Sequence, residues 1–339
     1  MFRVALPVKQ AVVKLLAAVA CRCGLVALFY WLNRRAKRTL TFHNVLRDDL
    51  FIPGVANGVS SKLSDFEFII DECARKFRFS LDFDDPKTLT VTFDDGYRNQ
   101  YTTAFASLKK RGISAYVFCS GECLGGRPLT IDLLTHWICG VPDGEYELRG
   151  HGGIALTREN RLEVWMRVLW PMFCGDAAGL GLNVLSACDA AYPVEKVLAA
   201  LGDEYRDERL AGLSREQCAE MRAAGWRIGW HTGSHFPLSR LSEEDARREM
   251  TPPERDGMET VCFSYPYGEE ASVGRREERI AASIGYPCAV SNVFESRRNA
   301  GNRYFIPRYE LSPDRHLLHF ELSGLKFFLR HFRLLPHGV

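Results

Sequence analysis

Short strand-like segments alternate with helical segments along most of the chain, and this alternation is the strongest constraint on its fold. The strand-like segments are rich in β-branched and aromatic residues and cover 39–45, 89–93, 114–119, 226–230, 261–265, 287–291 and 305–311. The helical segments cover 97–111, 214–224, 243–250, 273–284 and 315–332. Strands that alternate with helices pair in parallel, so the sequence predicts an α/β fold with a parallel sheet or barrel. The loops at the carboxyl ends of such strands gather on one rim, where the chemistry of these folds is found.

Residues 124–213 interrupt the alternation. They combine helical segments with glycine and aromatic residues, and we interpret them as an insertion in a catalytic domain that spans 39–339. Trp165, Met166, Trp170 and Phe173 lie within this insertion. We expect these side chains to form packing faces, with stacking against a sugar as the alternative.

The N-terminal segment needs a separate interpretation. Residues 1–47 contain Lys and Arg but no Asp or Glu, and the apolar runs 15–21 and 23–32 flank Arg22. An arginine near the bilayer centre costs about 2.5–3.5 kcal/mol, which disfavours a spanning helix. We therefore expect 1–38 to form a basic amphipathic helix that lies on a membrane surface. A helix packed on the domain, a spanning helix and a cleaved signal peptide remain alternatives.

Charge and cysteine content narrow the class of protein. Beyond residue 47 the acidic residues outnumber the basic ones, so the chain offers no general basic field for nucleic acid. The 11 cysteines are irregularly spaced and form no CxxC pair. They are expected to be free thiols in a reducing compartment, which indicates a cytoplasmic protein at the inner face of the membrane.

Two aspartates, Asp94 and Asp95, follow the expected strand 89–93 and precede Gly96. Two neighbouring carboxylates repel each other unless a cation or a proton lies between them. A divalent metal bound by one carboxylate, with the other free to take a proton from water, removes this conflict. A simple Asp-Gly turn before a helix is the alternative interpretation.

Two histidines, His231 and His235, follow the expected strand 226–230, and Gly233 and Pro237 favour a loop there. Two imidazoles and one carboxylate make a three-ligand metal site with positions left for water and substrate. Among 9 histidines, an incidental pair is the alternative. Because both motifs follow strands, we expect them on the same rim.

The expected strand 261–265 runs into the tight turn Y-P-Y-G at 265–268, which can present a backbone N–H and an aromatic wall to a sugar. In this order, TFDDG at 92–96, HTGSH at 231–235 and this turn resemble the signatures of the polysaccharide deacetylase family, the NodB-homology domain. The resemblance covers about 39–311, with 124–213 poorly matched.

The resemblance implies a distorted (β/α) barrel of about seven parallel strands and a hydrolase that acts on non-peptide carbon–nitrogen bonds. It also implies roles by motif position. Asp94 would be the catalytic base, while Asp95, His231 and His235 would bind a divalent metal, most often zinc, with cobalt or nickel as alternatives. The backbone N–H of Tyr267 would help to hold the oxyanion.

The chain departs from the family pattern in two places. Many members carry an arginine that orients the base in the third motif, where this chain has Ser264, and Arg308 is expected to supply that charge instead. The general acid is also open. Residues 41–45 resemble the first-strand Tyr-His motif of one family branch, which favours His43 over His316 or His319.

The expected activity is metal-dependent removal of N-acetyl groups from an amino-sugar glycan or a lipid-linked saccharide. A deformylase or amidohydrolase acting on a small carrier-linked sugar is one alternative. A catalytically silent, membrane-associated glycan-binding protein is another, because the third-motif arginine is missing. The expected partners are the saccharide and a membrane surface contacted through 1–38, and no nucleic acid.

Overall fold

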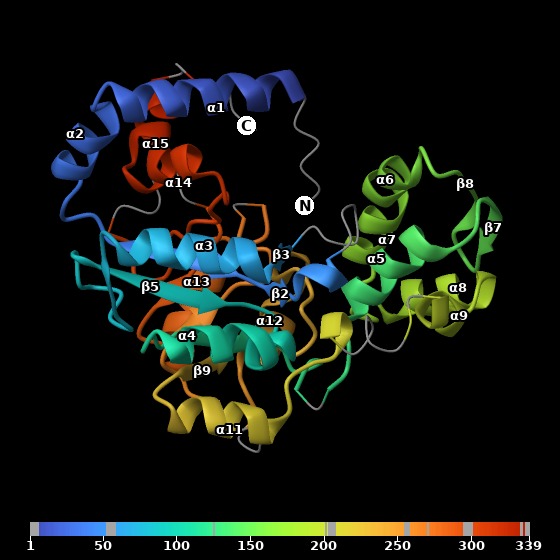
Figure 1. Cartoon of the computed structure of the whole chain (residues 1–339). Coiled ribbons are helices and arrows are strands. Elements are labelled where there is room, and N and C mark those ends of the chain that lie inside the picture. Colours follow the sequence, from blue (N-terminus) through green and yellow to red (C-terminus); the bar gives the residue numbers. More distant parts are fainter. Residues whose placement is uncertain are drawn as a thin grey trace.

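A curled parallel sheet forms the centre of the molecule in the computed structural model, which describes residues 7–51, 59–124, 126–200, 202, 208–253, 258–269, 271–293, 301–332 and 335 (Figure 1). The sheet follows the order β1 (Arg38–Phe42), β5 (Thr88–Phe93), β6 (Tyr116–Cys119), β9 (Arg227–Trp230), β10 (Phe263–Ser264) and β11 (Ala289–Val290). Each of these pairings is parallel, and the short β4 (Arg78–Phe79) pairs with the start of β5. The predicted parallel sheet is confirmed.

An extended segment, 306–309, closes this sheet into a barrel. Ile306 forms a parallel bridge with Val290 of β11, and Tyr309 forms one with Leu40 of β1. Tyr309 N–H donates to the carbonyl of Thr39 at 2.7 Å, so the segment lies between the first and last strands. The predicted distorted (β/α) barrel is therefore confirmed, but the expected regular strand at 305–311 is wrong, because only isolated bridges form there.

Helices cover the outside of the barrel. Figure 1 shows α3 (Leu63–Ala74), α4 (Ala106–Lys110) and α11 (Arg215–Ala223) around it, and α4 continues from the π-helical turn η3 (Gln100–Phe105). Two more helices connect consecutive strands of the sheet, α12 (Glu243–Met250) and α13 (Arg275–Ile284). The strands are buried on both faces, as expected for a parallel sheet, and β5 is buried along its whole length. A smaller sheet pairs β2 (Asn44–Leu46) with β3 (Ser60–Lys62) beside the barrel.

The insertion forms a helical lobe on one side of the barrel (Figure 1). It contains α5 (Thr130–Gly140), the hairpin β7 (Gly144–Leu148) and β8 (Gly152–Leu156), α6 (Arg161–Val164), η4 (Trp165–Leu169), α7 (Trp170–Gly175), α8 (Leu182–Ala191) and α9 (Val194–Ala200). Trp165 and Phe173 are buried in its core, as their expected packing role requires, whereas Met166 is 45% exposed. Residues 125, 201 and 203–207 of the expected insertion lie outside the described residues.

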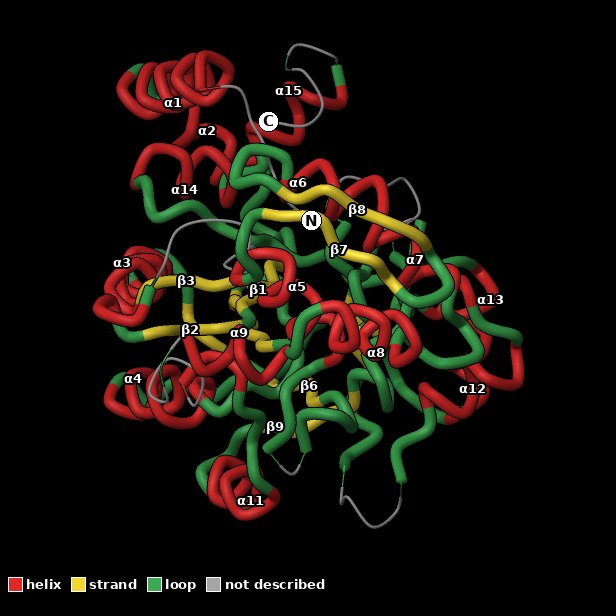
Figure 2. Tube along the Cα trace, turned by 90° about the vertical axis from the view of Figure 1, so that its right-hand side faces the viewer, coloured by secondary structure: helices red, strands yellow, loops and turns green. Residues whose placement is uncertain are grey.

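Four helices from the two ends of the chain pack together (Figure 2). They are α1 (Pro7–Arg22), α2 (Leu25–Leu32), α14 (Arg315–Leu322) and α15 (Leu325–His331). The single helices expected within 1–38 and at 315–332 are each broken in two, because Gly24 and Gly324 adopt left-handed backbone with φ of 80° and 84°. Residues 1–6 lie outside the described part of the chain.

Among the described helices, no single one is long and apolar enough to cross a bilayer, but α1 and α2 together reach the required length and apolarity as a pair bent by 78°. All 11 cysteines are free thiols, as expected from their spacing.

Candidate functional site

Three predicted metal ligands, Asp95, His231 and His235, meet at the carboxyl ends of β5 and β9. Their candidate ligand atoms all lie within 4.8 Å of one another, and all three side chains are buried. Asp95 Oδ1 is 3.3 Å from His231 Nε2 and 3.2 Å from His235 Nε2. The structure thus gathers, from two different strands, the residues that a three-ligand metal site needs.

The protonation pattern of this group fits a cation. His231 Nδ1–H donates to the carbonyl of Ser264 at 2.7 Å, which leaves the Nε2 lone pair facing Asp95. Asp95 Oδ1 is buried and accepts no hydrogen bond. Burial works against a charged imidazole, yet the Asp95 carboxylate raises the pKa of His235, so the group attracts positive charge. Nitrogen and oxygen donors converging in this way are the ligands that Zn²⁺ prefers.

The backbone around the site is held in left-handed conformations. Five described residues other than glycine have positive φ, and four of them lie in the three sequence motifs: Asp95 (76°), Thr232 (68°), His235 (55°) and Tyr267 (62°). Such conformations persist only where the surroundings enforce them, and they cluster at functional sites. Consecutive residues of a strand point to opposite faces of a sheet. At the end of β5, the left-handed conformations of Asp95 and Gly96 turn the chain, so both Asp94 and Asp95 can lie on the same rim.

Glu249 of α12 supports the histidine loop. Its Oε2 accepts hydrogen bonds from Ser234 N at 2.8 Å and from Ser234 Oγ at 3.0 Å. Its backbone carbonyl accepts from Gly233 N at 3.2 Å and from Trp230 Nε1 at 2.8 Å. Glu249 therefore holds the loop between the two histidines in place. The sequence pattern did not predict this role.

Arg308 of the closing segment binds Asp94 through two parallel hydrogen bonds. Nη1 donates to Asp94 Oδ1 at 2.8 Å, and Nη2 donates to Oδ2 at 2.5 Å. The two side chains are 0% and 1% exposed. Ser264 Oγ, at the position where the family arginine was expected, also donates to Asp94 Oδ1 at 3.0 Å. The structure thus brings together Arg308, Ser264 and the predicted base.

This pairing keeps Asp94 ionised. Burial alone would raise its pKa, but Arg308, helped by His231 and His43, holds the pKa of Asp94 below its usual value. Arg308 has partners for its other donors as well, because Nε reaches the Ser291 carbonyl and Nη2 reaches Asn292 Oδ1. The guanidinium is therefore fixed, and so is the carboxylate it holds.

His43 lies beside the Asp94 carboxylate, and the other candidate acids do not. Its Nε2 is 3.8 Å from Asp94 Oδ2, and its side chain is 16% exposed. His319 instead contacts Glu72 Oε2 at 3.2 Å and Tyr30 Oη at 2.9 Å. Like His319, His316 lies on α14, so His43 is the candidate acid that the fold places at the rim.

Tyr267 and Trp170 form an aromatic wall next to the three ligands. The Tyr267 ring centroid is 4.8 Å from that of His235 and 5.1 Å from that of Trp170, which comes from α7 of the insertion. Within the described part of the chain, the Tyr267 N–H makes no backbone hydrogen bond. The donor expected to hold an oxyanion is thus not used in a backbone hydrogen bond of the described residues.

Two further acidic residues near the centre were missed by the sequence analysis. Tyr97 Oη donates to Asp132 Oδ2 at 2.8 Å, and burial together with the nearby Asp95 raises the pKa of Asp132 to about 7. Glu122 accepts from Thr130 N and Oγ1 at 2.8 and 2.7 Å, and burial raises its pKa. Asp132 lies in the first turn of α5, where an acidic residue is ordinary, so no local signal separated it from a helix-capping residue.

No protein-family model matches this chain, and no curated protein matches it. Solved structures similar to it include the Streptococcus pyogenes deacetylase PplD in complex with acetate, at 15% identity and a TM-score of 0.48, over 83% of this chain and 96% of that one. IcaB from Ammonifex degensii is similar at 17% identity and a TM-score of 0.48, over 85% and 98%. BC0361, a polysaccharide deacetylase from Bacillus cereus, is similar at 14% identity and a TM-score of 0.46, over 84% and 68%.

We predict that Arg308→Met destabilises the protein by about 3–5 kcal/mol at neutral pH, because it leaves the buried Asp94 carboxylate without its partner. The loss should shrink as the pH falls, since Asp94 can then take up a proton and become neutral. Urea unfolding at several pH values measures both effects. Arg303→Met is the control, because its ion pair with Asp84 is exposed and should contribute little. Equal stability of Arg308→Met and wild type would contradict the assigned pairing.

We predict that Asp132→Asn stabilises the metal-free protein at alkaline pH by about 1–3 kcal/mol. The folded-state pKa of Asp132 is about 7 against an ordinary value of 3.8, so the folded protein loses stability as the pH rises through this interval. Thermal melting in EDTA at about pH 5 and about pH 8 should show a clearly larger gain at the higher pH, because about pH 5 lies near the start of this interval. Asp143→Asn is the control, because Arg161 lowers the pKa of this exposed carboxyl and no gain is expected.

Proposed function

We propose that this protein is a metal-dependent polysaccharide deacetylase, which hydrolyses N-acetyl groups on an amino-sugar glycan or a lipid-linked saccharide. The proposal rests on two groups that lie next to each other on one rim, a candidate metal site and an ionised carboxylate. Asp95, His231 and His235 converge as metal ligands, and the adjacent Asp94 is kept ionised by a buried arginine. The first motif that resembles the NodB-homology signatures supplies Asp94 and Asp95, and the second supplies His231 and His235, whereas Arg308 lies outside all three motifs.

The chemistry follows from the positions of the side chains. A divalent ion held by Asp95, His231 and His235 would polarise the amide carbonyl and make a bound water more acidic. Asp94, ionised and fixed by Arg308, would take the proton from the attacking water. The Tyr267 N–H would donate to the oxyanion that develops on the carbonyl oxygen.

The departing amine needs a proton, because an amide anion is a very poor leaving group. We assign this step to His43, whose Nε2 lies 3.8 Å from Asp94 and whose side chain retains some solvent access. Asp94 and His43 would then act in sequence, with the first accepting a proton as water attacks and the second donating one as the amine leaves.

The silent glycan-binding alternative rested on the missing arginine of the third motif. Arg308 approaches Asp94 from a different segment of the barrel, with two hydrogen bonds to Asp94 and one to Ser264 Oγ at 3.1 Å. This arrangement supports an enzyme. Deformylation or amide hydrolysis on a small carrier-linked sugar would use the same centre, and competition between polymeric and small substrates separates these activities.

We predict that Asp94→Asn lowers acetate release from an N-acetylated glycan by about 10²–10⁴-fold while the bound metal is retained. His231→Ala should lose the metal and the activity together, because it removes a ligand. Metal analysis of the purified proteins and an acetate assay measure both properties. His151→Ala, in an exposed turn of the insertion, is the matched histidine control and should behave as wild type. Full activity of Asp94→Asn would refute the proposed base.

We predict that Trp170→Ala raises KM for a glycan by about 3–10-fold with little change in kcat, because the partly exposed indole beside Tyr267 adds binding but touches no reacting atom. Trp170→Phe should retain most of the affinity. Steady-state kinetics with metal-loaded protein give the two constants separately. A fall in kcat at unchanged KM would show that Trp170 positions the site rather than the sugar.

A further inference from the structure

Three helices at the two chain ends expose most of the large apolar side chains on the described surface, and we call this set the apolar face. It consists of Val12, Leu15, Leu16 and Val19 of α1, Leu25, Leu28, Trp31 and Leu32 of α2, and Phe328 and Phe332 at α15. Leu15 and Trp31 are 66% and 61% exposed. Elsewhere in the described chain, only Val59, Met166 and Leu182 are large apolar side chains with comparable exposure. Apolar surface concentrated in this way marks an interaction site.

The opposite side of the same helices packs on the protein. Val13, Ala17 and Ala20 of α1 and Phe29 of α2 are buried in one cluster with Phe320 of α14. The helices therefore lie along the body of the molecule with one side buried and the other side uncovered (Figures 1 and 2). Phe29 and Phe328 are in edge contact at 5.0 Å, so α15 lies directly beside α2.

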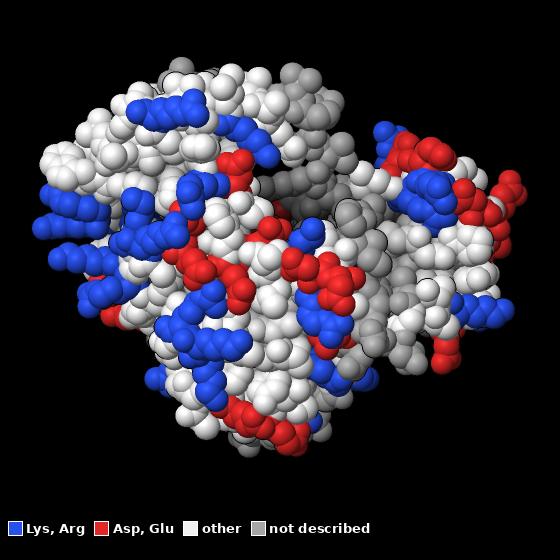
Figure 3. Space-filling view, in the orientation of Figure 1, with Lys and Arg blue, Asp and Glu red and all other residues white. Residues whose placement is uncertain are grey.

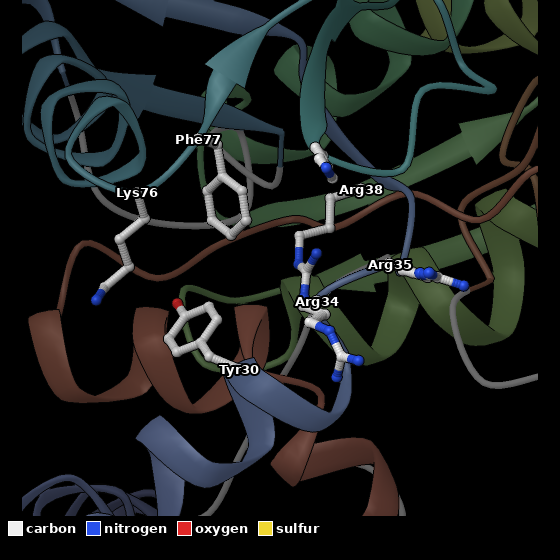
Figure 4. Close-up of a pocket in the computed structure, with 7 residues that line it drawn as sticks. Tyr30, Arg34, Arg35, Arg38, Lys76 and Phe77 are labelled. Carbon is white, nitrogen blue, oxygen red and sulfur yellow. The ribbon is translucent and has the colours of Figure 1, made fainter.

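A basic pocket adjoins the apolar face at the end of α2. Its volume is 540 Å³, and its lining residues are Tyr30, Arg34, Arg35, Arg38, Lys76, Phe77 and Lys87. Figure 4 shows the two rings of Tyr30 and Phe77 between Lys76 on one side and the three arginines on the other. In Figure 3, Lys and Arg side chains crowd the left edge of the molecule directly below the uncharged surface over α2.

Most of the positive charge in this pocket is uncompensated. The lining includes no Asp or Glu, and among the ion pairs of the described residues none involves Arg34, Arg35, Lys76 or Lys87. Arg38 has a structural role, because its guanidinium donates to the carbonyls of Leu322, Ala36 and Asn33. The other four cations have no acidic partner among the described residues, although Arg34 also donates to the Trp31 carbonyl and Lys76 lies over the Tyr30 ring. Their charge is available to an anion, and arginine matches the geometry of phosphate well.

We propose that the apolar face inserts into the surface of an anionic lipid bilayer and that the basic pocket binds the phosphate of an anionic headgroup. A bilayer surface supplies hydrocarbon and phosphate side by side, which is the arrangement of the face and the pocket. Trp31, with Arg34 over its ring at 5.0 Å, lies at the junction, where tryptophan is favoured at membrane interfaces. Anionic lipid is typical of the cytoplasmic leaflet, which gives the proposed location of the protein.

Other binding partners would match either the apolar face or the basic pocket, but not both. Nucleic acid offers phosphate without hydrocarbon, and a second copy of the chain offers hydrocarbon without a dense negative charge. A spanning arrangement of α1 and α2 is also disfavoured, because α14, which packs on α1, carries Arg315 and Glu321 and would have to follow them into the bilayer. The helices are therefore placed flat on the surface, in line with their 78° bend.

The pocket is distinct from the candidate catalytic centre. Arg38 is the first residue of β1, whereas His43 follows the last residue of that strand. The two sites thus lie at opposite ends of one strand, and lipid binding does not depend on the proposed hydrolysis. The sequence suggested a membrane contact through 1–38, and the structure adds α15, Lys76 and Lys87 to that surface.

Vesicle flotation of the full chain tests the proposal. The probes are vesicles of phosphatidylcholine alone and vesicles that also contain phosphatidylglycerol. We expect binding to the anionic vesicles to be tighter by about tenfold or more, because each cation near the surface contributes about 1 kcal/mol. Leu28→Gln with Trp31→Gln in the face, and Arg34→Glu with Arg35→Glu in the pocket, should each lower binding by about tenfold or more.

Matched controls lie on the insertion. Met166→Gln with Leu182→Gln changes exposed apolar residues, and Arg149→Glu with Arg158→Glu reverses exposed charges. Both control pairs should bind vesicles as wild type does, and melting curves check that every variant is folded. Equal binding to both vesicle types, or unchanged binding by the face and pocket variants, would overturn the proposal.

Three further outcomes would each replace the lipid proposal with a different ligand for the face or the pocket. Binding of soluble glycerol phosphate that is lost in the pocket variant, while vesicle binding is unchanged, would assign the pocket to a free phosphate ester. A lipid-free dimer that Leu28→Gln with Trp31→Gln dissociates, without loss of vesicle binding, would assign the face to a second copy. Nucleic-acid binding lost in the pocket variant alone would assign the pocket to a polynucleotide.

Discussion

The buried pair of Arg308 and Asp94 is the interaction on which both the barrel and its candidate site depend. Arg308 comes from the segment that closes the sheet between β11 and β1, and its donors reach Asp94 after β5, Ser264 of β10 and Ser291 after β11. One guanidinium thus ties the closing segment to three other positions of the rim. Because the pair is removed from water, its hydrogen bonds must be well formed, and this requirement fixes the orientation of the carboxylate.

Two adjacent carboxylates can coexist in this buried site because each has a different source of positive charge. Asp94 is neutralised by Arg308, and Asp95 faces the imidazoles of His231 and His235, where a cation fits. The left-handed backbone at Asp95 separates the two side chains into these two environments. Burial and the nearby Asp95 carboxylate raise the pKa of Asp132 to about 7 and so favour its protonated form.

The strands β5, β6 and β9, helix α12 and the three polar motifs were predictable, because local periodicity and turn residues specify them. The breaks at Gly24 and Gly324 were not recognised, since an isolated glycine within an apolar helical pattern is often tolerated. The closing segment was expected as a regular strand, but only Ile306 and Tyr309 pair, on different neighbours. Glu249, Asp132 and Lys76 gave no signal, because their roles arise from contacts between segments far apart in the chain.

The sequence by itself determined the class of the fold, the order of its elements and the residue types available at the rim, because these depend on local pattern and on the chemistry of each side chain. Only the tertiary structure decided which of these residues meet. In the folded protein, Arg308 pairs with Asp94, and His43 rather than His319 lies beside that carboxylate. Helices α1, α2 and α15 come together in one surface. Such choices depend on distances across the sheet and between chain ends, and no local pattern encodes those distances.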